Sequence, residues 1–404
     1  MRVCFSVRKR GLMELDVARF RADFPALDNY IWMQNGGVSI TPTPVAQEHA
    51  ERMRELYERG PMHIVYPEEE YARRRQSMET LARFFSCAVE ELALMRGVSE
   101  AFQTVLRGLD WQAGDRVLVS DDEEAAVLLP LLHLRDVRGI ELIRVPVVDD
   151  ADEQVALFER HFDAHTRLIA LSHVTTDRGF RLPVERLCAA ARARGILSFV
   201  DMAHSAGLWP QSLSDIDCDF AGLLSYKWMY APYAAGLLYV HRERLDALQV
   251  RYAGGRSQES LDFERGVYRL RESAERFQYG PWSWPLVHAW ARSAQYLTSI
   301  GVSAIWQRTE HLADLLKEAL VGVGAQLYTP LAGERSAALV SFGLHGISGK
   351  LLSQELESRW NIVVKALPHG PEGLRASMTF FLLEDEIDVL MEGLKSLAKE
   401  RGGR

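Results

Sequence analysis

The chain has 404 residues, a formal net charge of −8 and 48% hydrophobic residues, which is more length than one hydrophobic core normally serves, so we expect two domains. The acidic balance argues against a nucleic-acid-binding surface, and no apolar run reaches the roughly 20 residues of a membrane span. The cysteines lack metal-ligand spacing, so we expect reduced thiols in a cytoplasmic protein and no metal site; they are Cys4, Cys87, Cys188 and Cys218.

The first residues, 1–9, carry charge but no apolar core follows them. We therefore expect no secretory signal there, and Met13 is a second candidate start beside Met1. We expect residues 1–35 to pack with a C-terminal domain, residues 36–284 to form a large domain, and residues 285–404 to form a small one.

In the middle of the chain, short apolar runs alternate with helical patterns. The runs predicted as buried strands are 116–120, 167–173, 196–201, 220–225 and 234–240. The helical stretch 183–195 opens with Pro183 and closes with Gly195, as helices prefer. This alternation is typical of a mostly parallel sheet covered by helices.

After Trp284 the pattern changes to that of a smaller α+β domain. We expect strands at 337–344, 361–367 and 374–381, and a final helix from Glu384 whose apolar residues share one face.

A turn followed by a helix is predicted at MRGVSEAFQTVLRGL (95–109). Gly97 makes the turn, and Ser99 is the expected N-cap. A helix N-terminus with free N–H groups and a hydroxyl binds phosphate. An ordinary capped helix explains the same residues, so this stretch alone is weak evidence.

Two charged residues follow predicted strands. Asp201 ends the strand 196–201, and Lys227 follows the strand 220–225. Strand ends in open α/β sheets face the crevice where ligands bind. A lysine in a partly apolar pocket has a lowered pKa and can form a Schiff base, and a buried carboxylate needs a cation such as a pyridinium nitrogen. The plainer readings are a lysine that reaches the surface along Trp228 and an aspartate that caps a turn.

The order of phosphate turn, aspartate and lysine resembles the fold-type I pyridoxal phosphate enzymes of the class V aminotransferase group, which includes cysteine desulfurases. SDDEE (120–124) and the short loop before Arg375 are most similar to the isopenicillin N epimerase-like branch. The resemblance covers nearly the whole chain and is carried by NGGVSITPTPV (35–45), MRGVSEA (95–101), VLVSDDEEAAVLLP (117–130), LSHVTTDRGFRLP (171–183), VDMAHSAG (200–207), SYKW (225–228), RFQYG (276–280) and RASMTFF (375–381).

This resemblance implies a three-layer α/β/α large domain with a mostly parallel sheet, and a smaller α+β C-terminal domain. It implies pyridoxal 5′-phosphate as cofactor, an amino-acid substrate, and a homodimer with active sites at the interface. Lys227 would form the Schiff base and move protons at the substrate α-carbon. Asp201 would pair with the pyridinium, and His204 would lie near the phenolic oxygen of the cofactor.

The remaining site residues are implied in the same way. Arg375 would bind the substrate carboxylate, and Asn35 would lie where the N-terminal segment meets the active site. The other residues would contact the cofactor, mainly its phosphate and phenolic oxygen; they are Gly97, Val98, Ser99, Glu124, Thr176, Tyr226 and Gly280.

Three positions depart from the family pattern. Glu124 stands where many members place an aromatic ring over the cofactor; a glutamate cannot stack, but it can act as an acid or base. Leu224 replaces a common serine, with Ser225 one place later. Pro281 after Gly280 removes a hydroxyl expected to reach the neighbouring subunit's phosphate. We therefore expect fewer groups to bind the cofactor phosphate than in typical members. One alternative is that the chain is a non-catalytic relative that kept the fold.

The fate of the α-proton decides the reaction. Its return to the α-carbon gives epimerisation, its return to C4′ of the cofactor gives transamination, and loss of a β-substituent gives a lyase. We favour an epimerase or aminotransferase, with a β-lyase of a sulfur-containing amino acid as the alternative. The loop ALPHGPEGL (366–374) contains no cysteine nucleophile, so we expect that the chain is not a cysteine desulfurase.

Overall fold

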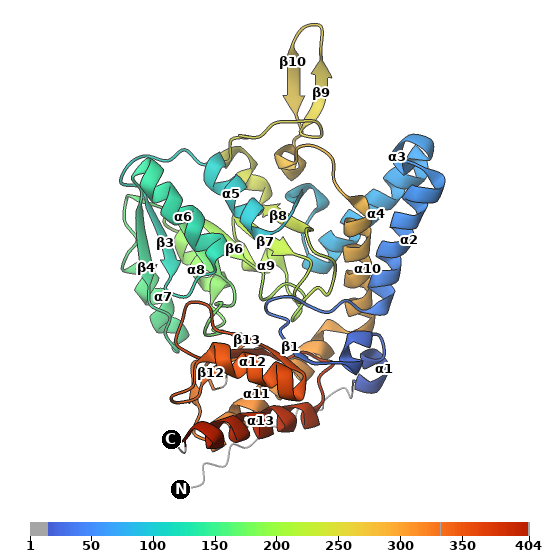
Figure 1. Cartoon of the computed structure of the whole chain (residues 1–404). Coiled ribbons are helices and arrows are strands. Elements are labelled where there is room, and N and C mark those ends of the chain that lie inside the picture. Colours follow the sequence, from blue (N-terminus) through green and yellow to red (C-terminus); the bar gives the residue numbers. More distant parts are fainter. Residues whose placement is uncertain (1–14, 332, 403–404) are drawn as a thin grey trace.

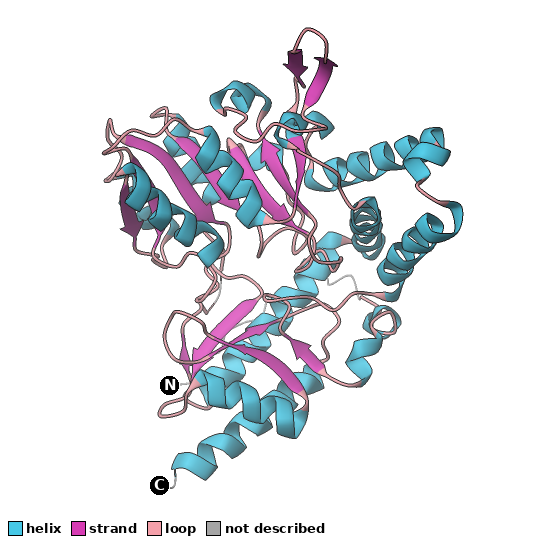
Figure 2. Cartoon of the chain, turned by 45° about the horizontal axis from the view of Figure 1, so that its top comes forward, coloured by secondary structure: helices cyan, strands magenta, loops and turns pink. Residues whose placement is uncertain are grey.

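The fold is described from a computed structural model, which covers residues 15–331 and 333–402. Both candidate start sites and Cys4 lie outside the described residues. A seven-stranded sheet forms the larger body, with the strand order β2-β8-β7-β6-β5-β3-β4 (Figures 1 and 2). Its strands are β2 (Leu92–Met95), β3 (Arg116–Ser120), β4 (Glu141–Val145), β5 (Thr166–Ser172), β6 (Leu197–Asp201), β7 (Phe220–Leu224) and β8 (Gly236–Val240).

The central pairings of this sheet, from β4 through β3, β5 and β6 to β7, are all parallel. Only β8 runs against its neighbours, β7 and β2. The prediction of a mostly parallel sheet is therefore confirmed.

Helices cover both faces of the sheet, and the strand residues alternate between the two layers. On β3, Val117 and Val119 pack into the cluster that contains α5, whereas Leu118 joins the cluster that contains α8. Strands buried on both faces are apolar at nearly every position, which explains their continuous apolar runs. The covering helices are α5 (Val98–Gly108), α6 (Ala125–Arg138), α7 (Ala151–Glu159) and α8 (Val184–Arg192), with the short α9 (Leu213–Ile216).

Long helices extend from the side of this body (Figure 1). The helix α10 (Trp284–Ile300) packs against α2 (Thr43–Arg59) and α4 (Pro67–Phe85), and α3 (Met62–Val65) joins α2 to α4. The strands β9 (Gln258–Asp262) and β10 (Val267–Leu270) form a hairpin that projects from the body above the β8 end of the sheet (Figure 1). Short 3₁₀ turns lie at Pro25–Asp28, Val89–Glu91, Arg242–Ala247 and Ala274–Phe277.

A five-stranded sheet with the order β1-β13-β14-β12-β11 forms the smaller body. Its strands are β1 (Ile31–Met33), β11 (Gln326–Leu327), β12 (Leu339–Gly343), β13 (Ile362–Ala366) and β14 (Leu374–Ser377), and its helices are α11 (Val302–Gly322), α12 (Gly349–Trp360) and α13 (Glu384–Gly402). The strand β14 ends earlier than the predicted 374–381, because the chain turns at Thr379–Leu382 toward α13.

The N-terminal segment lies on this smaller body. β1 pairs in parallel with β13, and Arg21 of α1 (Val17–Arg21) forms an ion pair with Glu386 of α13. The helix α10 falls almost entirely in the predicted small domain, but it packs against α2 and α4 of the predicted large domain. The predicted boundary at 285 therefore cuts through a group of helices that pack together. The division at 36 and 285 stays a prediction.

One local prediction is wrong. Ser99 does not cap α5: the helix begins at Val98, and Gly97 precedes it without a side-chain cap. The reason is the close approach of β8, since a Cβ on Gly236 would lie 2.5 Å from the Cα atom of Gly97. The turn is therefore tight against the sheet, and the hydroxyl of Ser99 lies inside the first helical turn. None of the described helices is long and apolar enough to cross a membrane.

Candidate active site

The carboxyl ends of the parallel strands meet one cavity of about 740 Å³. Asp201 ends β6, Lys227 follows β7, and Glu124 precedes α6, so three segments far apart in the chain bring charged groups together. Such an edge is the usual binding site of an open α/β sheet. The first turn of α5 and Tyr226 complete the wall; the predicted cofactor residues that line the cavity are Gly97, Val98, Ser99, Glu124, Asp201, Tyr226 and Lys227.

Lys227 is buried, with 8% of the residue exposed. Burial lowers the pKa of its ammonium group to about 8, although Glu124 and Asp201 favour the charged form. Its Nζ atom lies 3.3 Å from Nε2 of His204, and Asn35 Nδ2 donates to the Lys227 carbonyl at 3.1 Å. The lysine is therefore held in place, and its neutral, nucleophilic form is accessible near neutral pH.

Asp201 is a buried carboxylate with one internal partner. Its Oδ1 atom accepts the Ala203 N–H at 2.7 Å, and burial raises the pKa of the carboxyl group to about 6. Burial also lowers the pKa of His204 well below its usual value, and its Nδ1 atom has no hydrogen-bond partner among the described residues. A cation placed against Asp201 would stabilise its ionised form.

On the side of the cavity that is predicted to bind phosphate, the candidate donors are mainly backbone groups. The free N–H groups of the first turn of α5 face the cavity at Val98 and Ser99. Ser225 is not available there, because its hydroxyl donates to the Pro232 carbonyl. Gly280 donates to the Gly255 carbonyl, and it is Tyr279, not Gly280, that lines this cavity.

Thr176 connects Glu124 to Arg375. The Thr176 hydroxyl donates to Glu124 Oε2 at 2.5 Å and accepts from Arg375 Nη1 at 3.2 Å, while the Thr176 carbonyl accepts from the same Nη1. Burial acts to raise the pKa of Glu124, but the Thr176 hydrogen bond and the nearby cations, led by Lys227, hold it below its usual value. Glu124 is therefore ionised at neutral pH.

Arg375 keeps part of its guanidinium unpaired. The residue is 1% exposed, yet Nε and Nη2 have no hydrogen-bond partner among the described residues. These are adjacent donors on one edge of the guanidinium, the arrangement that matches both oxygens of a carboxylate. A buried donor without a partner is costly, so this edge indicates a place for an anionic ligand group.

The sequence reasoning missed Lys365 on β13. It is half-buried and pairs in register with Arg375 on β14. The available signal was a single charge within the otherwise apolar run NIVVKAL.

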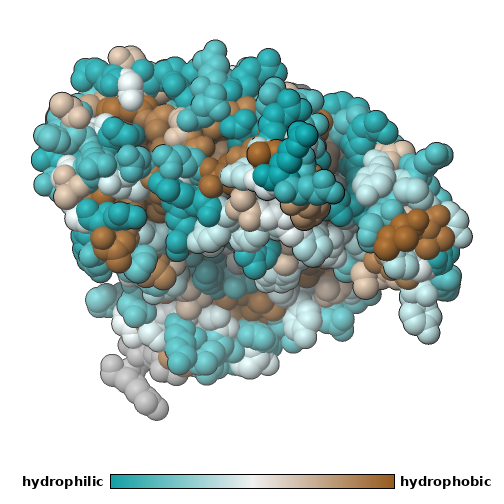
Figure 3. Space-filling view, turned by 90° about the horizontal axis from the view of Figure 1, so that it is seen from above, coloured by the Kyte–Doolittle hydropathy of each residue, from teal (hydrophilic) through white to brown (hydrophobic). Residues whose placement is uncertain are grey.

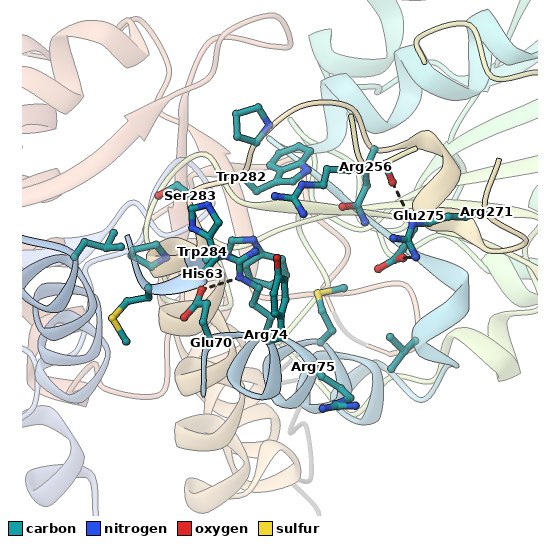
Figure 4. A pocket seen from close by; sticks show the side chains of 18 residues that line it. His63, Glu70, Arg74, Arg75, Arg256, Arg271, Glu275, Trp282, Ser283 and Trp284 are labelled. Carbon is teal, nitrogen blue, oxygen red and sulfur yellow. Dashed lines mark hydrogen bonds and ion pairs between the residues drawn. The ribbon is translucent and has the colours of Figure 1, made fainter. Parts of the chain in front are cut away.

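A second cavity of about 500 Å³ lies between α4 and the segment 281–285 (Figure 4). Arg74 donates to Glu70 and lies 4.7 Å from the ring of Trp284. The two cavities share no lining residue, so this second one is not part of the Lys227 site within one chain.

Comparison with known families identifies the class. The model of the aminotransferase class-V family matches residues 31–390. The chain therefore belongs to this family of pyridoxal phosphate enzymes.

Two curated proteins that are similar in sequence to this chain have different activities. The chain is 32% identical over 343 residues to the isopenicillin N epimerase of Streptomyces clavuligerus, with 80% of this chain and 84% of the relative covered. It is 27% identical over 413 residues to a cysteine desulfurase of Pectobacterium carotovorum, with 96% and 100% covered.

Two solved structures share the fold. The cystine C-S lyase C-DES in complex with cysteine persulfide superposes with a TM-score of 0.84 at 25% identity, covering 92% of this chain and 98% of that one. A lysine-to-alanine mutant of C-DES, with glycine covalently linked to its pyridoxal phosphate, superposes with a TM-score of 0.85 at 25% identity, covering 93% and 98%.

The expectation that the chain is not a cysteine desulfurase is contradicted by these similarities. Cysteine desulfurases match nearly the full length of the chain. The expectation relied on one loop without a thiol, which is too narrow an argument, because a C–S bond can also break by loss of a β-substituent without a protein nucleophile.

Pyridoxal phosphate is the cofactor of this family, and the described residues fit it. The cavity offers helix N–H groups for a phosphate, a buried carboxylate for a pyridinium nitrogen, and a buried lysine for the aldehyde. The most direct sign of that fit is the carboxyl group of Asp201, which is buried and has a pKa raised by burial, so a cationic ring nitrogen beside it would stabilise its ionised form.

We expect Lys227→Ala to abolish the absorbance of lysine-bound cofactor and turnover, while thermal unfolding shows a folded protein, because the alanine cannot bind the aldehyde. Borohydride reduction followed by peptide mapping locates the labelled lysine. Label on Lys365 or on any other lysine of the wild-type protein would contradict this assignment.

Proposed function

We propose that the protein epimerises the α-carbon of an amino acid, with Lys227 and Glu124 as its two acid–base groups. The observation that carries the proposal is their placement. Lys227 follows β7 and Glu124 follows β3, and β6 and β5 separate these strands in the sheet. Both residues line one cavity, and we infer from the two intervening strands that they approach a bound substrate from opposite sides.

The protonation states of the pair suit this reaction. With its pKa lowered only to about 8, most of Lys227 carries a proton at pH 7, whereas the lowered pKa of Glu124 keeps its carboxylate ionised. Bound pyridoxal phosphate makes the α-proton acidic by delocalising the resulting charge. Glu124 can then accept the proton on one face while Lys227 donates a proton on the other.

Arg375 and Thr176 would position the substrate. The free Nε and Nη2 edge of Arg375 matches the α-carboxylate, and Thr176 fixes the remaining nitrogen. Because Thr176 also binds Glu124, the carboxylate anchor and the base share one hydrogen-bonded chain. The relatives named isopenicillin N epimerase support the same reaction type.

A second candidate is a lyase or desulfurase of a sulfur-containing amino acid. The names of the cysteine desulfurases and of the cystine C-S lyase support it. In that reaction a β-substituent leaves, and no second acid–base group is needed on the opposite face. Product analysis with cysteine and cystine, against an enantiomer assay with amino acids that lack a β-leaving group, separates the two candidates.

We expect Glu124→Gln to lower the rate of inversion by roughly 10²–10⁴-fold, because an amide cannot exchange a proton with the α-carbon. In deuterated water, exchange of the α-proton should persist for the enantiomer that Lys227 serves, with retention of configuration. Measurement uses NMR for exchange and chiral chromatography for inversion. Inversion at the wild-type rate would show that Glu124 is not the second acid–base group.

We expect Arg375→Lys to lower kcat/KM for carboxylate substrates by a factor that corresponds to a loss of roughly 2–4 kcal/mol in transition-state stabilisation. The reason is that a lysine cannot form two parallel hydrogen bonds with a carboxylate. The loss should shrink for amines without a carboxylate, which serve as the internal control. Cofactor content and thermal unfolding check that the site is intact. Equal handling of carboxylate substrates by variant and wild type would make Arg375 structural.

We also propose a homodimer that covers the face around α3. Ile64 and Val65 on α3 are 69% and 51% exposed, and an apolar patch lies on that side of the molecule (Figure 3). The second cavity, with Trp282 and Trp284 in its wall, lies beside this helix, and tryptophans are enriched at interfaces (Figure 4).

We expect sedimentation to show a dimer, and Ile64→Glu to weaken it, because the charge would be buried at the interface. Val137→Glu, at an exposed position on α6, is the matched control. A wild-type monomer with full turnover would contradict the proposal.

The cytoplasmic location also stays a proposal. It is supported by the free thiols of Cys87, Cys188 and Cys218, the cysteines within the described residues. Burial raises the pKa of Cys87 and of Cys188 to about 12, so these thiols are unreactive at neutral pH.

A further inference from the structure

Lys365 and Arg375 form a pair of neighbouring cations. They are directly opposite each other on the antiparallel strands β13 and β14. Side chains at opposite positions of two paired strands project from the same face of the sheet, with their Cβ atoms about 5 Å apart. Lys365 therefore lies beside the proposed carboxylate anchor.

The positive charge of Lys365 has no internal partner. The residue is half-buried and forms no hydrogen bond or ion pair with any other residue in the described part of the chain. Burial and Arg375 lower the pKa of its ammonium group, while Glu124 and Asp177 act to raise it. These influences place Lys365 within the electrostatic environment of the site.

The nearby carboxylates are poor partners for Lys365. Glu124 accepts the hydroxyl of Thr176. Burial, together with Asp122, raises the pKa of Asp177, which weakens it as an anion. Asp122 itself accepts two N–H groups and pairs with Arg178.

One substrate carboxylate does not use this lysine. The free Nε and Nη2 atoms of Arg375 match the two oxygens of a single carboxylate. Once that pair forms, the charge of Arg375 is balanced and the charge of Lys365 is not. A second anionic group on the substrate would balance it.

We propose that Lys365 binds a second carboxylate of the substrate, so that the enzyme acts on α-amino dicarboxylic acids. Arg375 takes the carboxylate at the reacting carbon, and Lys365 takes the distal one. This inference rests on the proposed function, since it places an amino acid in the same site. Lys365 would be a specificity-determining residue.

The test compares matched acids and amides. The pairs L-glutamate with L-glutamine, and L-aspartate with L-asparagine, differ in the charge of the distal group and little in size. Dissociation constants come from absorbance titration of the cofactor-loaded protein, and kcat/KM from inversion assays. We expect wild type to prefer at least one acid over its amide by about tenfold or more, as a charge-assisted contact provides.

We expect Lys365→Met to remove most of this preference and Lys365→Arg to keep most of it, because arginine retains the charge. Lys350→Met, at an exposed position on α12, is the matched control and should keep the wild-type ratio. An equal effect of Lys365→Met on acids and amides, or no acid preference in wild type, would overturn the inference. A wild-type protein that responds to no amino acid would overturn the proposed function, and the inference with it.

Discussion

The free-energy cost of burying charged side chains near the carboxyl ends of the strands determines which ligand groups the site can accept. Lys227, Asp201 and Arg375 are all buried, and an isolated ion loses several kcal/mol of hydration when it leaves water. The described residues compensate these groups only in part: burial shifts the pKa values of Lys227 and Asp201 toward their neutral forms, and two donors of Arg375 have no hydrogen-bond partner among those residues. A ligand that carries a cation for Asp201, an aldehyde for Lys227 and a carboxylate for Arg375 would complete the balance.

The site also depends on contact between the two sheets. Arg375 projects from β14 of the smaller sheet and binds Thr176, which follows β5 of the larger one. Asn35, which follows β1, binds the backbone of Lys227. These hydrogen bonds hold Arg375, the proposed carboxylate anchor, and Asn35 in fixed positions relative to the Lys227 segment. If the proposed roles hold, small errors in this geometry would cost large factors in rate.

Similarity to both epimerases and desulfurases has a simple chemical basis. The cofactor and its lysine labilise the α-carbon in every case, and the protein decides what happens next. In this chain the distinguishing features are a carboxylate at position 124 and a short loop at 366–374. The Glu124 carboxylate can exchange a proton with a bound substrate, which is the physical reason for preferring epimerisation as the proposal.

The sequence by itself determined the class of fold, and its resemblance to the class V aminotransferase group implied the cofactor. Apolar strands alternating with helices predict a parallel sheet, and Asp201 and Lys227 at strand ends are then expected at one edge. The sequence does not indicate that α5 starts at Val98, because the close approach of Gly236 to Gly97 is a tertiary contact.

Only the tertiary structure decided how the site is connected. The chain of hydrogen bonds from Glu124 through Thr176 to Arg375 joins residues that are far apart in sequence, so no local pattern indicates it. The pairing of Lys365 with Arg375 follows from strand register, which depends on packing of the whole smaller sheet. Burial, and with it the shifted pKa values of Lys227 and Asp201, likewise arises only in the folded chain, where segments distant in sequence surround both residues.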